Sequence, residues 1–194
     1  MTTGIGIFLF DGAEELDWAG PWEVLAFWAT FWPEEAHVFT FARDQEVVTC
    51  AKGLRVLPDH DLHSLPPMDV LVYPGGQGTR AHLDDETLKD WVRETAGSGV
   101  LMTSVCTGAL VYGAAGLLDG RPATTHWASL DLLSSLGRDI EIRDERFIDD
   151  GDVVTAAGVS AGIDMALHLV SRLQSADRAR EVRRGIQYDP APPI

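Results

Sequence analysis

The chain has 194 residues, of which 45% are hydrophobic and 23% charged, which is typical of a globular protein with one core. The formal net charge of −15 repels nucleic-acid phosphates, so no nucleic-acid partner is expected. No apolar run approaches the ~18 residues of a membrane span, and the apolar N-terminus lacks the basic flank of a secretory signal. Two cysteines, Cys50 and Cys106, are too few for a disulfide framework. We therefore expect one cytoplasmic domain, residues 1–194, with no membrane partner.

Short apolar runs alternate along the chain with helix-like stretches. In chain order the pattern predicts a strand at 4–10, a helix at 21–32, strands at 36–42, 54–58 and 69–73, a helix at 84–99, a strand at 100–105, a helix at 107–118, a strand at 153–158 and a helix at 160–173. Pro21 suits the first turn of its helix. The arginine-rich segment after residue 175 carries charges of both signs and is interpreted as a solvated last helix. The alternation predicts an α/β fold with a mostly parallel sheet between helices.

Three segments rich in reactive or flexible residues follow predicted strands. The first strand ends before "DGAEELDWAGP", the strand at 69–73 ends before "PGGQG", and the strand at 100–105 ends at Cys106. The carboxyl ends of parallel strands meet at one edge of the sheet, which is where open α/β sheets bind ligands. We therefore expect a carboxylate, a glycine loop and a thiol to converge there.

Cys106 has two interpretations. Free cysteine is among the most buried residue types, and Cys50, which has no supporting motif, is assigned to the core. Cys106 differs because it lies at an abrupt turn from a strand to a helix. In a nucleophile elbow, such a turn makes the side chain of the turn residue project from the backbone. The helix N-terminus then favours a thiolate, so we expect the Cys106 pKa to lie below the ~8.5 of a free thiol. Spacing alone leaves both interpretations open.

The neighbouring loops offer candidate partners for this thiol. The glycines of "PGGQG" have two interpretations: a structural turn, or a loop whose Gly75 and Gly76 N–H groups form an anion-holding site with that of Thr107. No Gly-Lys-Ser/Thr sequence follows, so the turn is not a phosphate loop. Glu14, Glu15 and Asp17 are each candidates to move a proton, and spacing does not choose among them.

Histidines add little from the sequence alone. His60 and His63 have a spacing found in metal sites, but they lie in a polar loop without a second group of ligands. We therefore expect no metal. His126 follows a predicted short strand and is within range of the site, and we assign it no role.

Five segments together resemble the ThiJ/PfpI superfamily, also called the DJ-one superfamily, and most closely its isocyanide hydratase branch. They are "ELDWAGPWEVL" (15–25), "DVLVYPGGQG" (69–78), "SVCTGALVYGAAGLLDGRPATTHWASL" (104–130), "TAAGVSAGIDMALHLV" (155–170) and "YDPAPP" (188–193). The resemblance implies a flavodoxin-like three-layer sandwich, a single domain similar to class I glutamine amidotransferases, that works as a homodimer.

The same resemblance implies roles for individual residues. It makes Cys106 the elbow nucleophile and selects Asp17 as the thiol-facing carboxylate, where many members of the superfamily carry glutamate. Thr107 follows the nucleophile, as in the hydratases, whereas protease-like members have histidine there. Gly75 and Gly76 match the glycine pair beside the nucleophile, and His126 falls in a shared motif.

The resemblance therefore predicts a cofactor-free hydro-lyase that adds water to an isocyanide and gives an N-formamide. Two alternatives remain: glyoxalase-like or deglycase-like carbonyl chemistry, and a cysteine redox sensor without catalysis. Some regulators fuse this domain to a C-terminal helix-turn-helix pair, and we expect no such module because the chain stops at Ile194.

Overall fold

The computed structural model describes residues 2–44 and 46–191, so the last two prolines of the "YDPAPP" segment lie outside the described residues. Its main sheet has seven strands in the order β10-β11-β7-β6-β1-β2-β5. These strands are β1 (Thr3–Phe8), β2 (Ala36–Ala42), β5 (His60–Asp61), β6 (Val70–Tyr73), β7 (Leu101–Val105), β10 (Phe147–Asp149) and β11 (Val153–Ala156). All neighbours pair in parallel except β10, which runs antiparallel to β11 at the sheet edge.

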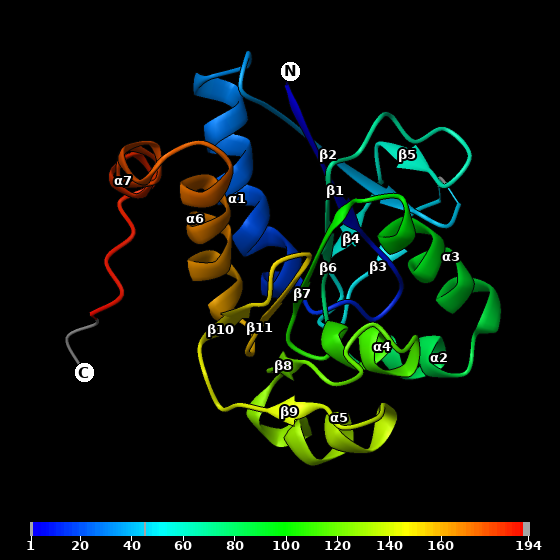
Figure 1. Cartoon of the computed structure of the whole chain (residues 1–194). Coiled ribbons are helices and arrows are strands. Elements are labelled where there is room, and N and C mark those ends of the chain that lie inside the picture. The colour runs from blue at the N-terminus through cyan, green and yellow to red at the C-terminus, as the bar shows by residue number, and fades with distance from the viewer. Residues whose placement is uncertain (1, 45, 192–194) are drawn as a thin grey trace.

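Helices cover both faces of this sheet, as the three-layer expectation requires. One layer contains α1 (Glu15–Phe31), α6 (Ala161–Leu173) and α7 (Ala176–Gly185), and the opposite layer contains α2 (Thr79–Leu83), α3 (Glu86–Gly97) and α4 (Gly108–Ala114) (Figure 1). Smaller elements lie outside the main layers: β3 (Val48–Thr49), β4 (Arg55–Val56), β8 (Pro122–Ala123), β9 (Glu141–Ile142), a 3₁₀ turn (Trp127–Ser129) and α5 (Leu130–Leu136). The predicted α/β fold with a mostly parallel sheet is confirmed.

The central strands are buried on both faces, which explains their continuous apolar sequences. Every residue of β6 and β7 is buried, including the polar Thr103 and Ser104 of β7. Thr103 donates its hydroxyl to the Leu71 carbonyl at 2.8 Å, so this buried hydroxyl is satisfied. The Ser104 hydroxyl has no hydrogen-bond partner in the part of the chain that the structure describes.

Helix α1 corrects one sequence expectation. It begins at Glu15, so Pro21 lies inside the helix rather than in its first turn. Proline has no N–H to donate, so the carbonyl four residues earlier, that of Asp17, receives no helical hydrogen bond from it. A Cβ added at Gly162 of α6 would lie 3.0 Å from the Pro21 ring, so the two helices meet closely there. Pro21 therefore lies where α1 meets α6, and Asp17 lies in the first helical turn.

No helix among the described residues is both long enough and apolar enough to cross a membrane.

Candidate active site

Cys106 occupies the turn between β7 and α4, with a backbone φ of 56°. A residue with a side chain rarely adopts this left-handed conformation, and it persists only where the surroundings hold it. The Cys106 N–H donates to the carbonyls of Ala156 and Ala157, each at 3.0 Å, and its carbonyl accepts the Thr125 hydroxyl at 2.6 Å. These contacts fix both ends of the Cys106 backbone, and the predicted elbow is confirmed.

The helix after the elbow needs glycine at its first position. A Cβ at Gly108 would lie 2.3 Å from the Tyr73 carbonyl oxygen, a distance that real Cβ atoms do not show. The backbones at the ends of β6 and β7 therefore approach too closely for any side chain. This contact explains the small residue two positions after the cysteine.

Asp17 is completely buried, at 0% exposure. Its Oδ2 accepts the Gly75 N–H at 2.9 Å, whereas its Oδ1 has no hydrogen-bond partner among the described residues. The carboxyl lies near the Cys106 thiol, and each of the two groups shifts the pKa of the other. Glu14 and Glu15 instead face Lys52, which forms an ion pair with each of them. The structure thus brings Asp17, of the three candidate acids, to the thiol.

The Gly75–Gly76 turn lies between Asp17 and Thr107. A Cβ at Gly75 would lie 2.5 Å from the Thr107 nitrogen and 2.8 Å from Asp17 Oδ2, and Gly76 has a φ of +116°. The Gly76 N–H donates to the Thr107 hydroxyl oxygen at 2.9 Å, just as the Gly75 N–H donates to Asp17. The two glycine N–H groups that the sequence offered for an anion site are therefore bonded within the protein, and their contact with substrate stays a prediction.

Burial is the largest influence on the pKa values of Asp17 and Cys106. It raises the Asp17 pKa to about 7, against hydrogen bonds from the Gly75 N–H and the Cys106 thiol that lower it. Burial and then the Asp17 charge raise the Cys106 pKa to about 12, although the N–H groups of Thr107 and Val159 donate toward the sulfur and lower it. The expected pKa below that of a free thiol is therefore wrong, because desolvation and a neighbouring carboxylate outweigh the N-terminus of a short helix.

We expect the alkylation of Cys106 by iodoacetamide to reflect this raised pKa. The thiolate fraction of a thiol with a pKa of about 12 grows about tenfold per pH unit, so the rate is expected to rise steadily from neutral pH to about pH 10. Mass spectrometry of labelled peptides in a Cys50→Ala background isolates the Cys106 rate. A rate that levels off below about pH 8 would indicate a low-pKa thiolate and contradict this assignment.

A cavity of about 290 Å³ opens onto the thiol. Its walls come from six separate parts of the chain and consist of Glu14, Ala51, Gly76, Gln77, Arg80, Cys106, Thr107, His126, Ala128, Ser129 and Val159. The predicted residues Cys106, Thr107, Gly76 and His126 thus meet in one space, whereas Gly75 and Asp17 are not among the residues that line it. The sequence analysis did not single out Arg80 or Val159. Val159 could have been found, because it follows the carboxyl end of strand β11, as the other site segments follow theirs.

The ring of His126 is held against the loop at Gly158, next to the cavity. Its Nδ1 accepts the Ala128 N–H at 3.2 Å, and a Cβ at Gly158 would lie 2.3 Å from its Cδ2, so the ring packs directly on that glycine. The other ring nitrogen, Nε2, has no hydrogen bond to the described residues. The structure therefore brings His126 to the cavity and leaves one nitrogen available.

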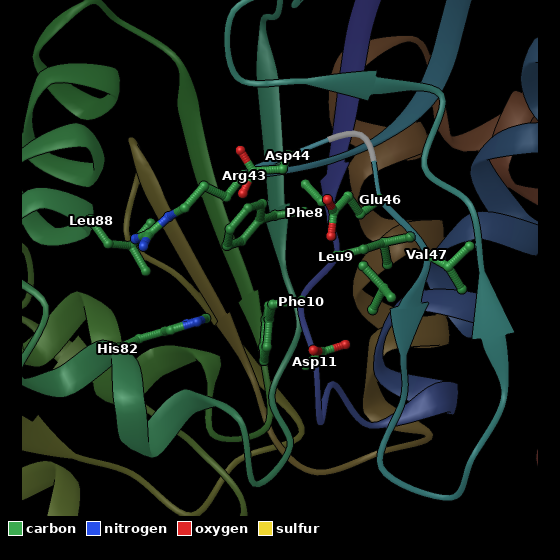
Figure 2. A pocket seen from close by; sticks show the side chains of 12 residues that line it. Phe8, Leu9, Phe10, Asp11, Arg43, Asp44, Glu46, Val47, His82 and Leu88 are labelled. Carbon is green, nitrogen blue, oxygen red and sulfur yellow. The ribbon is translucent and has the colours of Figure 1, made fainter.

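A second pocket, of about 320 Å³, contains none of the predicted site residues (Figure 2). Phe10 and His82 meet there edge-on with ring centroids 4.5 Å apart, and the Tyr73 hydroxyl lies 2.7 Å from His82 Nδ1. Burial, followed by the Arg43 charge, lowers the His82 pKa to about 4, so this imidazole is neutral at physiological pH. No thiol lines this pocket, so the Cys106 cavity is the candidate active site.

No group of three or more metal-ligating side chains occurs within residues 2–44 and 46–191.

Comparison with known proteins agrees with this geometry. Isonitrile hydratase of Pseudomonas putida is 42% identical over 194 residues, which cover 100% of this chain and 82% of that protein. The crystal structure of a THiJ/PfpI family protein from Pseudomonas syringae has a TM-score of 0.89 at 30% identity and covers 100% of this chain and 78% of its own. Drosophila melanogaster DJ-1beta shares the fold, with a TM-score of 0.85 at 23% identity over 97% of this chain and 100% of its own. The DJ-1/PfpI family matches residues 4–172, and the chain belongs to that family.

Proposed function

We propose that the protein is an isocyanide hydratase, which converts R–N≡C and water to the formamide R–NH–CHO. The observation that carries the proposal is the buried pair of Asp17 and Cys106 at the elbow, next to a cavity of small-molecule size. The full-length similarity to a protein named isonitrile hydratase supports this substrate class. The thiol supplies covalent catalysis, so the reaction needs no metal or organic cofactor.

The first half of the reaction joins the thiol to the substrate. Asp17, with a pKa of about 7, accepts the thiol proton as the sulfur forms a bond to the terminal isocyanide carbon. The protonated carboxyl then gives that proton to the same carbon, and a thioimidate, R–N=CH–S–Cys106, results. The unpartnered Oδ1 of Asp17 is an acceptor that no other described group occupies, and this suits it to proton transfer.

The second half adds water and releases the cysteine. Asp17 takes a proton from water as the water oxygen attacks the thioimidate carbon. Asp17 then gives that proton to the thioimidate nitrogen. The hydroxyl of the resulting adduct then loses its proton to Asp17 as the carbon–sulfur bond breaks. The departing sulfur receives that proton, and the formamide leaves. Each proton removed is returned, so one water is consumed per isocyanide.

The remaining site residues position these groups. The N–H groups of Thr107 and Val159 stabilise charge on the sulfur while it is an anion. The Thr107 hydroxyl is bonded to the Gly76 backbone, and we assign it to holding the glycine loop, which in turn holds Asp17. Substrate or water contacts with Thr107, Gly75 and Gly76 remain part of the proposal, and His126 Nε2 is free to join them.

The test is a turnover assay with a small alkyl isocyanide beside methylglyoxal, with product identified by mass spectrometry. Formamide production without added metal supports the hydratase. Consumption of methylglyoxal alone would replace it with carbonyl chemistry. If neither compound reacts and peroxide selectively oxidises Cys106, the protein is a redox sensor instead.

We also propose that the protein is a homodimer in the cytoplasm. Symmetric dimers are the commonest oligomers, and exposed apolar side chains are candidates for such an interface. The described chain exposes seven large ones: Leu16, Phe31, Val47, Leu54, Leu57, Trp127 and Leu132. The covalent cycle requires a free thiol, which favours a reducing compartment. Light scattering at micromolar concentration is expected to give twice the chain mass of 21.1 kDa, and a monomer alone would reject the dimer.

A further inference from the structure

Arg80 of α2 lies in the wall of the Cys106 cavity. Its Nη1 donates to the Thr79 hydroxyl oxygen at 3.1 Å and to the Gly76 carbonyl at 3.4 Å. The Thr79 hydroxyl donates to the Gly76 carbonyl at 2.7 Å, its oxygen lies 3.2 Å from the Thr107 hydroxyl oxygen, and Thr107 directly follows Cys106. A short hydrogen-bonded chain therefore fixes one corner of the guanidinium close to the reacting sulfur.

Arg80 is exposed, and the rest of its guanidinium has no hydrogen-bond partner among the described residues. In a chain with a net charge of −15, most lysines and arginines lie within 4 Å of a carboxylate, but Arg80 has no such partner among the described residues. Within the same described chain, no acceptor is bonded to its Nε or Nη2. The acid in the cavity wall, Glu14, is engaged by Lys52 instead. The Nε and Nη2 groups form the side of the fork that binds a carboxylate through two parallel hydrogen bonds.

We propose that Arg80 is a carboxylate-binding subsite, so that the substrate is an isocyanide whose R group carries a carboxylate. The inference rests on the proposed function and narrows its substrate class. A carboxylate held by Arg80 and an isocyanide carbon held at Cys106 belong to one small molecule, since both residues line a single cavity of about 290 Å³. The anion supplies binding energy at a point remote from the reacting carbon, and this energy orients that carbon.

The test compares para-isocyanobenzoate with para-isocyanobenzamide, which has nearly the same shape and no charge. We expect the wild-type kcat/KM to be about 10- to 100-fold higher for the carboxylate than for the amide, because hydrogen bonds between charged groups are stronger than those to a neutral group. Arg80→Gln is expected to bring that ratio to about one, and Arg80→Lys, which keeps the charge but loses the fork, to an intermediate value.

Arg184→Gln is the matched control. Arg184 lies in the last turn of α7, is exposed and lines no part of the Cys106 cavity, and its replacement changes the net charge equally. This variant is expected to keep the wild-type ratio. If the wild type and Arg80→Gln both turn over the two compounds equally well, the subsite is refuted while the hydratase function stands.

If neither isocyanide reacts, the proposed function is refuted but the subsite is not. A binding measurement tests the subsite in that case. The formamide para-formamidobenzoate is expected to slow alkylation of wild-type Cys106 by iodoacetamide, at concentrations where its carboxamide analogue does not. Arg80→Gln is expected to lose this protection while its melting temperature shows that it is folded. Equal protection by the two compounds, or protection that survives in Arg80→Gln, would overturn the subsite.

Discussion

Cys106→Ala is expected to lower isocyanide turnover by at least about 10⁴-fold, because no other group in the cavity wall forms the covalent intermediate. Cys106→Ser is expected to be nearly as inactive. A serine hydroxyl is a weaker acid than the Cys106 thiol, so its proton is harder to transfer to Asp17, and serine oxygen is a weaker nucleophile than sulfur. Formamide production followed by mass spectrometry measures both losses.

Cys50→Ala is the matched control for loss of a buried thiol. Cys50 is only 3% exposed and belongs to the core, and it contributes nothing to the cavity wall. Its replacement is expected to retain turnover. Melting temperatures of the Cys106 variants check that the elbow still folds with other residues at its positive φ. Substantial formamide production by folded Cys106→Ala would refute covalent catalysis by this residue.

Asp17→Asn is expected to change two measurements in opposite directions. Turnover is expected to fall by about 10²- to 10⁴-fold, because the amide keeps the shape of the carboxyl but transfers no proton. Alkylation of Cys106 at about pH 8 is expected to become faster, because the Asp17 charge raises the thiol pKa and the amide removes that charge. A general loss of structure at the site does not produce this combination at an unchanged melting temperature.

Glu15→Gln is the control for this substitution. Glu15 lies two residues away, outside the cavity wall, where its Oε1 accepts backbone N–H groups of Lys52 and Leu54. Glutamine keeps an acceptor there, so turnover is expected to survive. If Asp17→Asn leaves turnover unchanged, or if it slows alkylation of Cys106, the assignment of Asp17 as the proton carrier is wrong.

The sequence by itself determined the α/β alternation and the position of the elbow. Continuous apolar runs predict the buried β6 and β7, and β2 matches its predicted range, because doubly covered strands need apolar residues on both faces. It did not determine the short α2, nor the antiparallel β10, a strand of three residues that forms a tight hairpin with β11. The interior position of Pro21 was also missed, because α1 begins six residues earlier than the proline, at Glu15.

Only the tertiary structure decided the chemistry of the site. Spacing left three acids open, and the resemblance chose Asp17, but burial beside the thiol is what separates it from the Lys52-bound glutamates. The sequence argument from helix α4 gave the wrong direction for the Cys106 pKa, because a local dipole is visible in the sequence and desolvation is not. Arg80, His126 and Val159 reach the cavity from separate elements. Desolvation and unpaired charge depend on all neighbouring segments together, and local residue patterns do not record which distant segments become neighbours.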